Sequence, residues 1–236
     1  MSFSFTRFLE ALNSAVKYIP VTLELTLITF VVSLILGTII AAVRHFKVPV
    51  LSQFFAVFVT LYLGIPTMVA LLLYNLLFMT YYGDVAKALH ITIPISEIDP
   101  IYIGFFALII ATSCSLSESV RGAFRGIDQI QYEAGYSIGL TKMKTLRRVI
   151  FPQMIPILLP GMQNSLIGLL KASNLVSTIS VVEIMTGALL PSLLYYSYLE
   201  SYLAAALVYW MIGATIELLA YIAEKKTGQY LKKAIA

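Results

Sequence analysis

Charged residues are scarce in this chain. Asp, Glu, Lys and Arg together make up 12% of it, about half the share found in a soluble domain, whereas hydrophobic residues make up 59%. This balance excludes an ordinary soluble globular domain and indicates an integral membrane protein. The net charge of +4 comes from Lys and Arg that cluster beside apolar runs, so it does not indicate a nucleic-acid partner.

Reactive groups are scarce as well. Cys114 is the one cysteine, so no intrachain disulfide can form, and we interpret it as a packing residue. His45 and His90 lack a second ligand at metal spacing, and no Ser/His/Asp or Cys/His constellation is apparent. No G-x-x-x-x-G-K-[ST] phosphate loop is present. We therefore expect no catalytic residue, no metal site and no cofactor in the chain itself.

Long apolar runs predict about five membrane-spanning helices. They cover residues 19–43, 51–79, 100–119, 156–175 and 202–223. The second run contains Gly64 and Pro66, where we expect a break. Without the alternation of a membrane barrel, the prediction is an all-α, polytopic helical bundle. It forms one domain over residues 1–236, with a membrane core at about 19–224.

Two further segments lie outside these spans. The first residues, from Phe3 to Val16, predict a short amphipathic helix in the interface. Residues 177–190 are moderately apolar and contain Glu183, so we expect them to be partly embedded or packed on other helices.

Positive charges predict the orientation. Twelve Lys and Arg residues fall on one face of the predicted topology, and Arg7, Lys17 and Lys87 fall on the other. Because Lys and Arg are retained on the cytoplasmic side, the N-terminus is predicted outside and the C-terminus inside. The long polar loop at 121–152 is then cytoplasmic.

Helix signals recur inside that loop. Asp128 is placed to cap a first helix, which Gly139 can end in the left-handed conformation. Thr141 is placed to cap a second helix that stops before Pro152. The small residues Ala134, Gly135 and Gly139 suggest a surface that the backbone of another protein can approach closely.

The same loop resembles the EAA loop of ABC importer permeases, whose pattern is E-A-A, three residues, G, nine residues, I-x-L-P. The matching residues are Glu133, Ala134, Gly135, Gly139, Val149, Ile150, Phe151 and Pro152. Gly135 replaces the third position's Ala, Val149 the Ile and Phe151 the Leu.

Other segments resemble the polar amino-acid branch of these permeases (the histidine, glutamine and cystine type). They are Thr22-Leu23-Glu24-Leu25-Thr26, Glu118 with Arg121 and Gly122, and Leu169-Leu170-Lys171 followed by Ser173, Leu175, Val176 and Ser177. Two departures concern charge. Leu63 precedes Gly64 where the branch usually has Arg, and Ala172 follows Lys171 where it has an acid. The missing acid counts against a cationic substrate.

The resemblance implies a type I importer permease fold and a bacterial inner-membrane location. It implies two permease subunits, identical or paralogous, two ATPase subunits that bind ATP and Mg, and an extracytoplasmic binding protein. The function it implies is import of a polar amino acid, with cystine or another sulfur-containing one as candidates. The alternative is an ion-coupled secondary amino-acid carrier, which commonly has two repeated halves that are not visible here.

Two sets of site residues follow from the motifs. The loop that couples to the ATPase is expected to use Glu133, Ala134, Gly135, Gly139, Arg147 and Pro152. Candidates for the substrate pathway are Gly64, Pro66, Glu118, Lys171, Ser173 and Asn174. Glu118 has the alternative of bracing the loop, and Lys171 that of pairing with Glu183.

Small residues repeat along two spans. Ser113, Ser115, Ser117 and Ser119 favour close helix packing, with lining of a pathway as the alternative. Gly161, Ser165, Gly168 and Ala172 favour a helix contact, such as a dimer seam, over a site.

Overall fold

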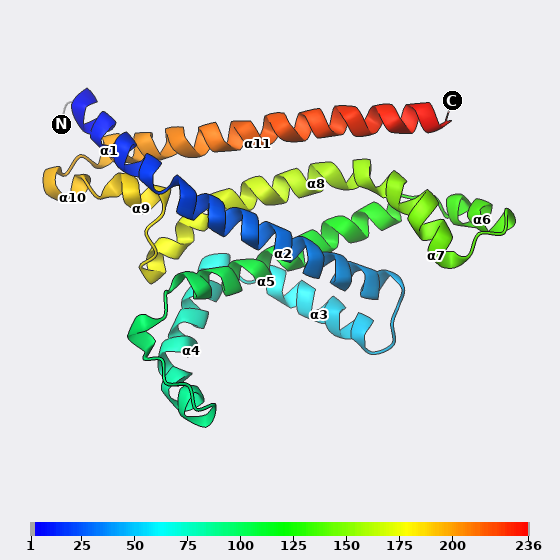
Figure 1. The fold of residues 1–236 in the computed structure, drawn as a ribbon, viewed down its shortest axis with the longest axis horizontal. Helices are drawn as coiled ribbons and strands as arrows, with labels where there is room; N and C mark the ends of the chain where they lie inside the picture. The colour runs from blue at the N-terminus through cyan, green and yellow to red at the C-terminus, as the bar shows by residue number, and fades with distance from the viewer. Residues whose placement is uncertain (1–2, 236) are drawn as a thin grey trace.

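The computed structural model describes residues 3–235, with side chains described through Thr227. In this part of the chain every regular element is helical (Figure 1). The elements are α1 (Phe5–Lys17), α2 (Ile19–His45), α3 (Leu51–Leu63), α4 (Thr67–Ala88), η1 (Ile95–Glu97), α5 (Ile101–Arg125), α6 (Gln129–Ser137), α7 (Lys142–Thr145), η2 (Leu146–Ile150), α8 (Phe151–Ala172), η3 (Ser173–Ile179), α9 (Ile184–Leu189), α10 (Ser192–Tyr195) and α11 (Tyr198–Ile235).

Four of these helices are long and apolar enough to cross a membrane: α2, α4, α5 and α11. A fifth crossing is formed if the helical run Lys142–Ile179 and the bent continuation Ile184–Tyr195 count as one span. The prediction of an all-α bundle with about five spans is confirmed. The expected break is present too, because Gly64, Ile65 and Pro66 separate α3 from α4.

The centre of the bundle is the pair α2 and α5, which cross with their small side chains facing each other. A Cβ at Gly37 would lie 2.9 Å from the backbone oxygen of Ser113, so the two backbones nearly touch there. Ser33 Oγ donates a 3.0 Å hydrogen bond to the carbonyl of Ile109 on the facing helix. Large apolar side chains such as Val31 and Ile35 are exposed on the opposite face of α2. This arrangement suits a bilayer, where close backbone contact holds helices together and large apolar side chains meet lipid.

α1 forms the predicted short helix and lies against α9 and α11 of the same chain. Ser14 Oγ donates to the carbonyl of Gly187 over 2.6 Å, and the backbone N–H of Ser4 donates to Glu200 over 2.8 Å. Glu183, at the start of α9, is fully buried, accepts from the backbone N–H of Thr186, and accepts from the Tyr209 hydroxyl. Residues 177–190 are thus packed on other helices, as predicted.

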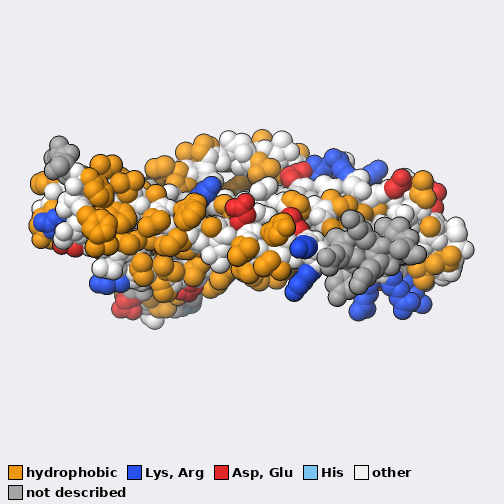
Figure 2. All heavy atoms as spheres, turned by 90° about the horizontal axis from the view of Figure 1, so that it is seen from above, with side chains coloured by type: hydrophobic (Ala, Val, Ile, Leu, Met, Phe, Trp, Pro, Cys, Tyr) orange, Lys and Arg blue, Asp and Glu red, His pale blue; other side chains and the backbone are white. Residues whose placement is uncertain are grey.

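The two ends of the bundle differ in charge. α6, α7 and the end of α11 lie at one end, and α1, α9 and α10 lie at the other (Figure 1). In the face shown by Figure 2, most of the Lys and Arg side chains lie toward the end that carries α6 and α7, and hydrophobic side chains cover much of the rest. The predicted clustering of positive charge therefore matches one physical end of the molecule.

One predicted boundary is wrong. The second helix of the loop does not stop before Pro152, because α7 continues through the π-helical turn η2 directly into α8. Proline lacks an N–H and its ring clashes with the carbonyl four residues earlier in a regular helix. Here Pro152 is in the first turn of α8, just after the wider turn, and the helix can continue through it. Helix α8, which contains the fourth predicted span, accordingly begins at Phe151, before Pro156.

Candidate functional site

The first loop helix, α6, has a cap at each end. Asp128 is its N-cap and accepts a 3.0 Å hydrogen bond from the backbone N–H of Ile130. Beyond its C-terminus Gly139 has a φ of +79°, and the N–H of Leu140 donates back to the carbonyl of Gly135 over 3.1 Å. A left-handed residue with this back-donated bond ends a helix sharply, and glycine adopts it without strain. Both predicted caps are confirmed.

The exposed surface of α6 differs from the predicted one at Gly135. Glu133 and Ala134 are exposed, as a partner surface requires, but Gly135 is buried. A Cβ at Gly135 would lie 2.5 Å from Cγ2 of Thr145, so the glycine faces α7 of the same chain. The prediction that Gly135 offers its small surface to another protein is therefore wrong. Its small size instead lets α6 pack tightly on α7.

The second half of the loop is tied to the bundle by polar and apolar contacts. Thr141 caps α7 by accepting from the N–H of Lys144 at 3.4 Å. Gln153 in α8 donates to the side-chain oxygen of Gln131 in α6 over 3.1 Å. Tyr132 packs on a buried cluster that includes Phe124, Ile127, Ile150 and Met154. Burial raises the pKa of the Tyr132 hydroxyl, which has no hydrogen-bond partner among the described residues.

Arg147 and Pro152 are both exposed on the continuous helix that leaves the loop. With Glu133, Ala134 and Gly139, they leave five of the six predicted coupling residues accessible from outside this chain. The caps on α6 and the continuity of α7 with α8 make the loop a stiff extension of the bundle. A force applied to α6 and α7 would therefore be transmitted along α8.

The same helix, α8, lines a cavity of about 460 Å³ between spans. Its walls come from the break between α3 and α4, from α5 and from α8. They consist of Tyr62, Leu63, Ile65, Thr67, Leu108, Ala111, Thr112, Ser115, Ser119, Gly161, Asn164, Ser165, Gly168, Leu169 and Ala172. None of these is Asp, Glu, Lys, Arg or His. The wall offers hydroxyl and amide groups but no fixed charge.

The two positions at which the sequence departs from the polar amino-acid branch are both in this wall. Leu63 stands where the branch usually has Arg, and Ala172 stands where it has an acid. Each departure replaces an ionisable side chain with an apolar one. Together they leave the cavity wall without an ionisable side chain at either position.

The serines of α5 have two different roles. Ser115 and Ser119 line the cavity, whereas Ser113 and Ser117 are buried in the contact with α2. The packing interpretation thus holds for one pair and the lining alternative for the other. Along α8, a Cβ at Gly161 would lie 3.2 Å from the Ser119 side chain, so Gly161 is at a helix contact. A Cβ at Gly168 would meet nothing within 4 Å, and this residue contributes open space to the cavity wall.

None of the six predicted pathway residues is part of this wall. Gly64 and Pro66 flank the lining residue Ile65, and Ser173 is buried with its hydroxyl donating to the carbonyl of Leu170 over 2.7 Å. Lys171 and Glu217 line a separate hollow of about 320 Å³ between α8 and α11. No ion pair joins Lys171 to Glu183 within the described residues. The alternative that Lys171 pairs with Glu183 is therefore wrong, and Asn174 is only partly buried.

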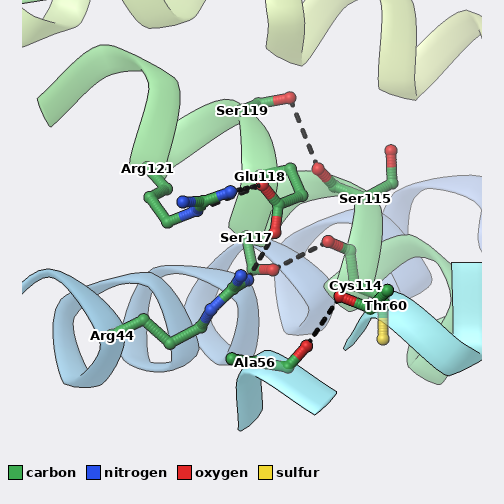
Figure 3. A network of polar contacts seen from close by, with 9 residues as sticks. All are labelled: Arg44, Ala56, Thr60, Cys114, Ser115, Ser117, Glu118, Ser119 and Arg121. Carbon is green, nitrogen blue, oxygen red and sulfur yellow. Dashed lines mark hydrogen bonds and ion pairs between the residues drawn. The ribbon is translucent and has the colours of Figure 1, made fainter. Parts of the chain in front are cut away.

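Glu118 is the centre of an ion-pair network (Figure 3). Arg44 of α2 and Arg121 of α5 reach it from two sides, and each binds one of its carboxylate oxygens. The network joins α2 to α5 about two turns before α5 ends at Arg125. The bracing interpretation of Glu118 is supported by these contacts, and sequence spacing alone could not find Arg44 as its partner.

Asn164, Thr112 and Thr67 are lining residues that the sequence reasoning missed. Each is an uncharged polar residue within an apolar run, and such a residue has no distinctive spacing. Asn164 falls between Gly161 and Ser165 in the small-residue series, which was the one signal that pointed to it. The small residues of α8 were predicted to make a helix contact, and that prediction did not include an open face.

Comparison with known proteins identifies the class. Residues 33–229 match the family of binding-protein-dependent transport system inner membrane components. The chain belongs to this family: it is the multi-pass inner-membrane permease subunit of an ABC importer, and nucleotide binding lies in the partner ATPase. A solved methionine ABC transporter, MetNI, in an inward-facing conformation shares the fold, with a TM-score of 0.69 and 16% identity over 91% of this chain and 96% of that one.

Within the family the chain is a polar amino-acid permease. It is 34% identical to a probable amino-acid ABC transporter permease protein, PatM, of Vibrio harveyi, over 96% of this chain and 97% of that protein. It is 32% identical to the L-cystine transport system permease protein TcyB of Bacillus subtilis, over 90% of this chain and 86% of that protein. The crystal structure of an amino acid ABC transporter with histidines superposes with a TM-score of 0.79 at 26% identity, covering 96% of this chain and all of that one. The family assignment sets aside the ion-coupled carrier.

Proposed function

We propose that this permease carries a polar amino acid of zero net charge into the cytoplasm, with cystine as the first candidate. The observation that carries the proposal is the uncharged wall of the cavity between α5 and α8. The positive and negative charges of a zwitterion compensate each other, so it needs no additional charged partner from the protein. It does need hydrogen bonds, which Thr112, Ser115 and Asn164 can offer. A cationic or anionic side chain would lose water there without gaining an ionic partner.

Cystine is favoured among neutral amino acids by the relatives. Two L-cystine permease proteins of Bacillus subtilis, TcyL and TcyB, are 30% and 32% identical to this chain. Relatives named for glutamine are 28% and 30% identical, and one named for nopaline is 25% identical. The higher identity of the cystine pair makes cystine the first candidate to test.

The mechanism we propose uses the continuous helix from the loop to the cavity. Two copies of this chain, or this chain and a paralogue, form the pathway, and two ATPase subunits bind the exposed residues Glu133, Ala134, Gly139, Arg147 and Pro152. Closure of the ATPases displaces α6 and α7. Because α7 runs through η2 into α8, that displacement moves the cavity wall and alternates access to it.

The orientation we propose has the N-terminus outside and the C-terminus in the cytoplasm. The support is that, in the face shown by Figure 2, most of the Lys and Arg side chains lie toward the end with α6 and α7. An extracytoplasmic binding protein then delivers substrate to the end formed by α1, α9 and α10.

The test is a competition assay with the assembled transporter and its binding protein in liposomes. Radiolabelled cystine uptake driven by ATP is measured against excess unlabelled cystine, glutamine, histidine, arginine and glutamate. We expect the neutral amino acids to compete and arginine and glutamate to have little effect. The binding protein also selects substrate. The amino acids are therefore ranked a second time without the binding protein, by how much each stimulates ATP hydrolysis. Equal competition by arginine or glutamate in both assays would contradict the proposal.

A further inference from the structure

A second hollow, of about 380 Å³, lies where the α2–α3 turn meets α5, away from the cavity. It is lined by Arg44, His45, Lys47, Ser52, Ala56, Arg121 and Arg125. Four of these seven residues are Lys or Arg. The proposed transport mechanism makes no use of this hollow.

The positive charges of this basic hollow are only partly neutralised. Glu118 binds both Arg44 and Arg121. Lys47 and Arg125 are exposed and make no ion pair among the described residues. Four cations and one carboxylate leave an excess of three positive charges around one concavity. The positive side chains that line one hollow repel one another, and a bound anion would relieve this repulsion.

The backbone adds to this field. Lys47 and Val50 have positive φ values of 51° and 64°, which fold the turn back so that α3 begins at the hollow. No side chain caps the N-terminus of α3, and Ser52 in its first turn lines the hollow. The N–H groups of Leu51, Ser52 and Phe54 donate to the carbonyls of Pro49, Val48 and Val50, so α3 contributes mainly the partial positive charge of its N-terminus.

Apolar side chains are exposed in the turn that carries Lys47. Phe46, Val50 and Leu51 are exposed at 50%, 78% and 48% of their full accessible surface. Along the chain the hollow falls where the apolar length of α2 ends, at Arg44 and His45, which is the depth of lipid headgroups. A ligand that matches both surfaces has an anionic phosphate next to hydrocarbon.

We propose that this basic hollow binds the phosphate of an anionic phospholipid, whose acyl chains lie against the exposed apolar side chains of the α2–α3 turn. A bound headgroup would fix the α2–α3 turn relative to Arg121 and Arg125, at the point where α5 leads into the loop. Anionic lipid would thereby stiffen the base of the loop. Basic pockets between membrane helices on the cytoplasmic side are suited to such headgroups.

The test measures lipid binding by the purified full-length chain in a neutral detergent. Lys47→Gln with Arg125→Gln removes two cations that hold no ion pair, so the network around Glu118 stays intact. Lys225→Gln with Lys226→Gln is the matched control, since it removes the same charge from exposed residues outside the hollow. Lys47→Arg with Arg125→Lys retains the charge and tests whether the positions tolerate change. Native mass spectrometry and thermal stability are recorded with phosphatidylglycerol, phosphatidylcholine or inorganic phosphate.

We expect wild-type protein to retain phosphatidylglycerol over phosphatidylcholine. The pocket variant should bind phosphatidylglycerol about 25-fold more weakly, at about fivefold for each cation. The control and the charge-retaining variant should bind as wild type does.

Three results would overturn the proposal. Equal binding by the pocket variant and the control would reduce the effect to general surface charge. Stabilisation by inorganic phosphate equal to that by phosphatidylglycerol would assign the hollow to a free anion. Equal retention of phosphatidylglycerol and phosphatidylcholine by the wild-type protein would show that the hollow does not select an anionic headgroup. Because none of these readouts involves transport, they leave the substrate proposal untouched.

Discussion

The coupling loop and the cavity are built on opposite principles. The loop is made from residues close together in the sequence, and its shape depends on backbone details such as the caps of α6 and the φ of Gly139. The cavity is made from three separate stretches, and its character depends on the absence of charge. Changes in the loop should therefore affect transport of every substrate, whereas changes in the cavity should affect which substrate is transported.

Gly139→Arg should have the largest effect and should abolish ATP-driven uptake. Any side chain at a φ of +79° is strained by about 1–2 kcal/mol, and Arg also adds bulk to the exposed surface. The measurement is uptake in liposomes, with membrane insertion checked by fractionation. Gly83→Arg is the control, because a Cβ added at this exposed helical glycine would likewise meet nothing within 4 Å. Wild-type uptake by the Gly139 variant would contradict the lever mechanism.

Ala172→Asp should change which substrates are transported and leave coupling to the ATPase intact. The new carboxylate restores the acid that the branch usually has and faces the cavity. Neutral amino-acid uptake should fall about tenfold, because an unpaired charge in the wall must be desolvated when a neutral substrate binds. Arginine should begin to compete.

Ala172→Asn separates charge from size in that experiment. The amide has nearly the same shape as the carboxylate, so neutral uptake should stay within about threefold of wild type. If Asn and Asp give the same selectivity, charge does not decide what the cavity accepts.

Gly135→Ala should weaken coupled uptake without changing selectivity. The added Cβ meets Cγ2 and Oγ1 of Thr145 at 2.5 and 2.9 Å, and overpacking of this kind costs about 1–3 kcal/mol. Thr145→Ala removes both atoms, so the double variant should recover part of the loss. A double-mutant cycle on melting temperature and uptake measures the coupling. Additive effects would mean that the two residues do not constrain each other.

Lys171→Ala should have the smallest effect, about twofold on the KM for uptake. Lys171 adjoins Ala172 in the sequence but lines the hollow against α11 with Glu217, away from the cavity. Removal of its charge changes the electrostatic potential in the cavity only weakly, because protein atoms and solvent lie between them. A tenfold or larger change in KM would indicate that Lys171 contributes to the substrate pathway. A loss of ATPase binding would indicate that it contributes to coupling.

Local signals predicted the loop well. Asp128, Gly139 and Thr141 each act on neighbours within a few residues, and the structure has all three caps in place. The same local reasoning failed at Pro152, because a π-helical turn before it lets the helix continue. It also failed at Gly135, where the partner is Thr145 of the same chain, and the sequence gives no sign of which surface a small residue will face.

The sequence by itself determined the features that depend on composition and on short spacing between residues. These features are the helical membrane fold, the break at Gly64–Pro66, the capped loop and its resemblance to ABC permeases. Hydropathy and helix capping act locally, so they can be read without coordinates. Only the tertiary structure decided which serines of α5 face the cavity, that Arg44 reaches Glu118, and that Leu63 and Ala172 share one wall. These facts depend on how distant helices are rotated against one another, and many side chains far apart in the sequence set that rotation together.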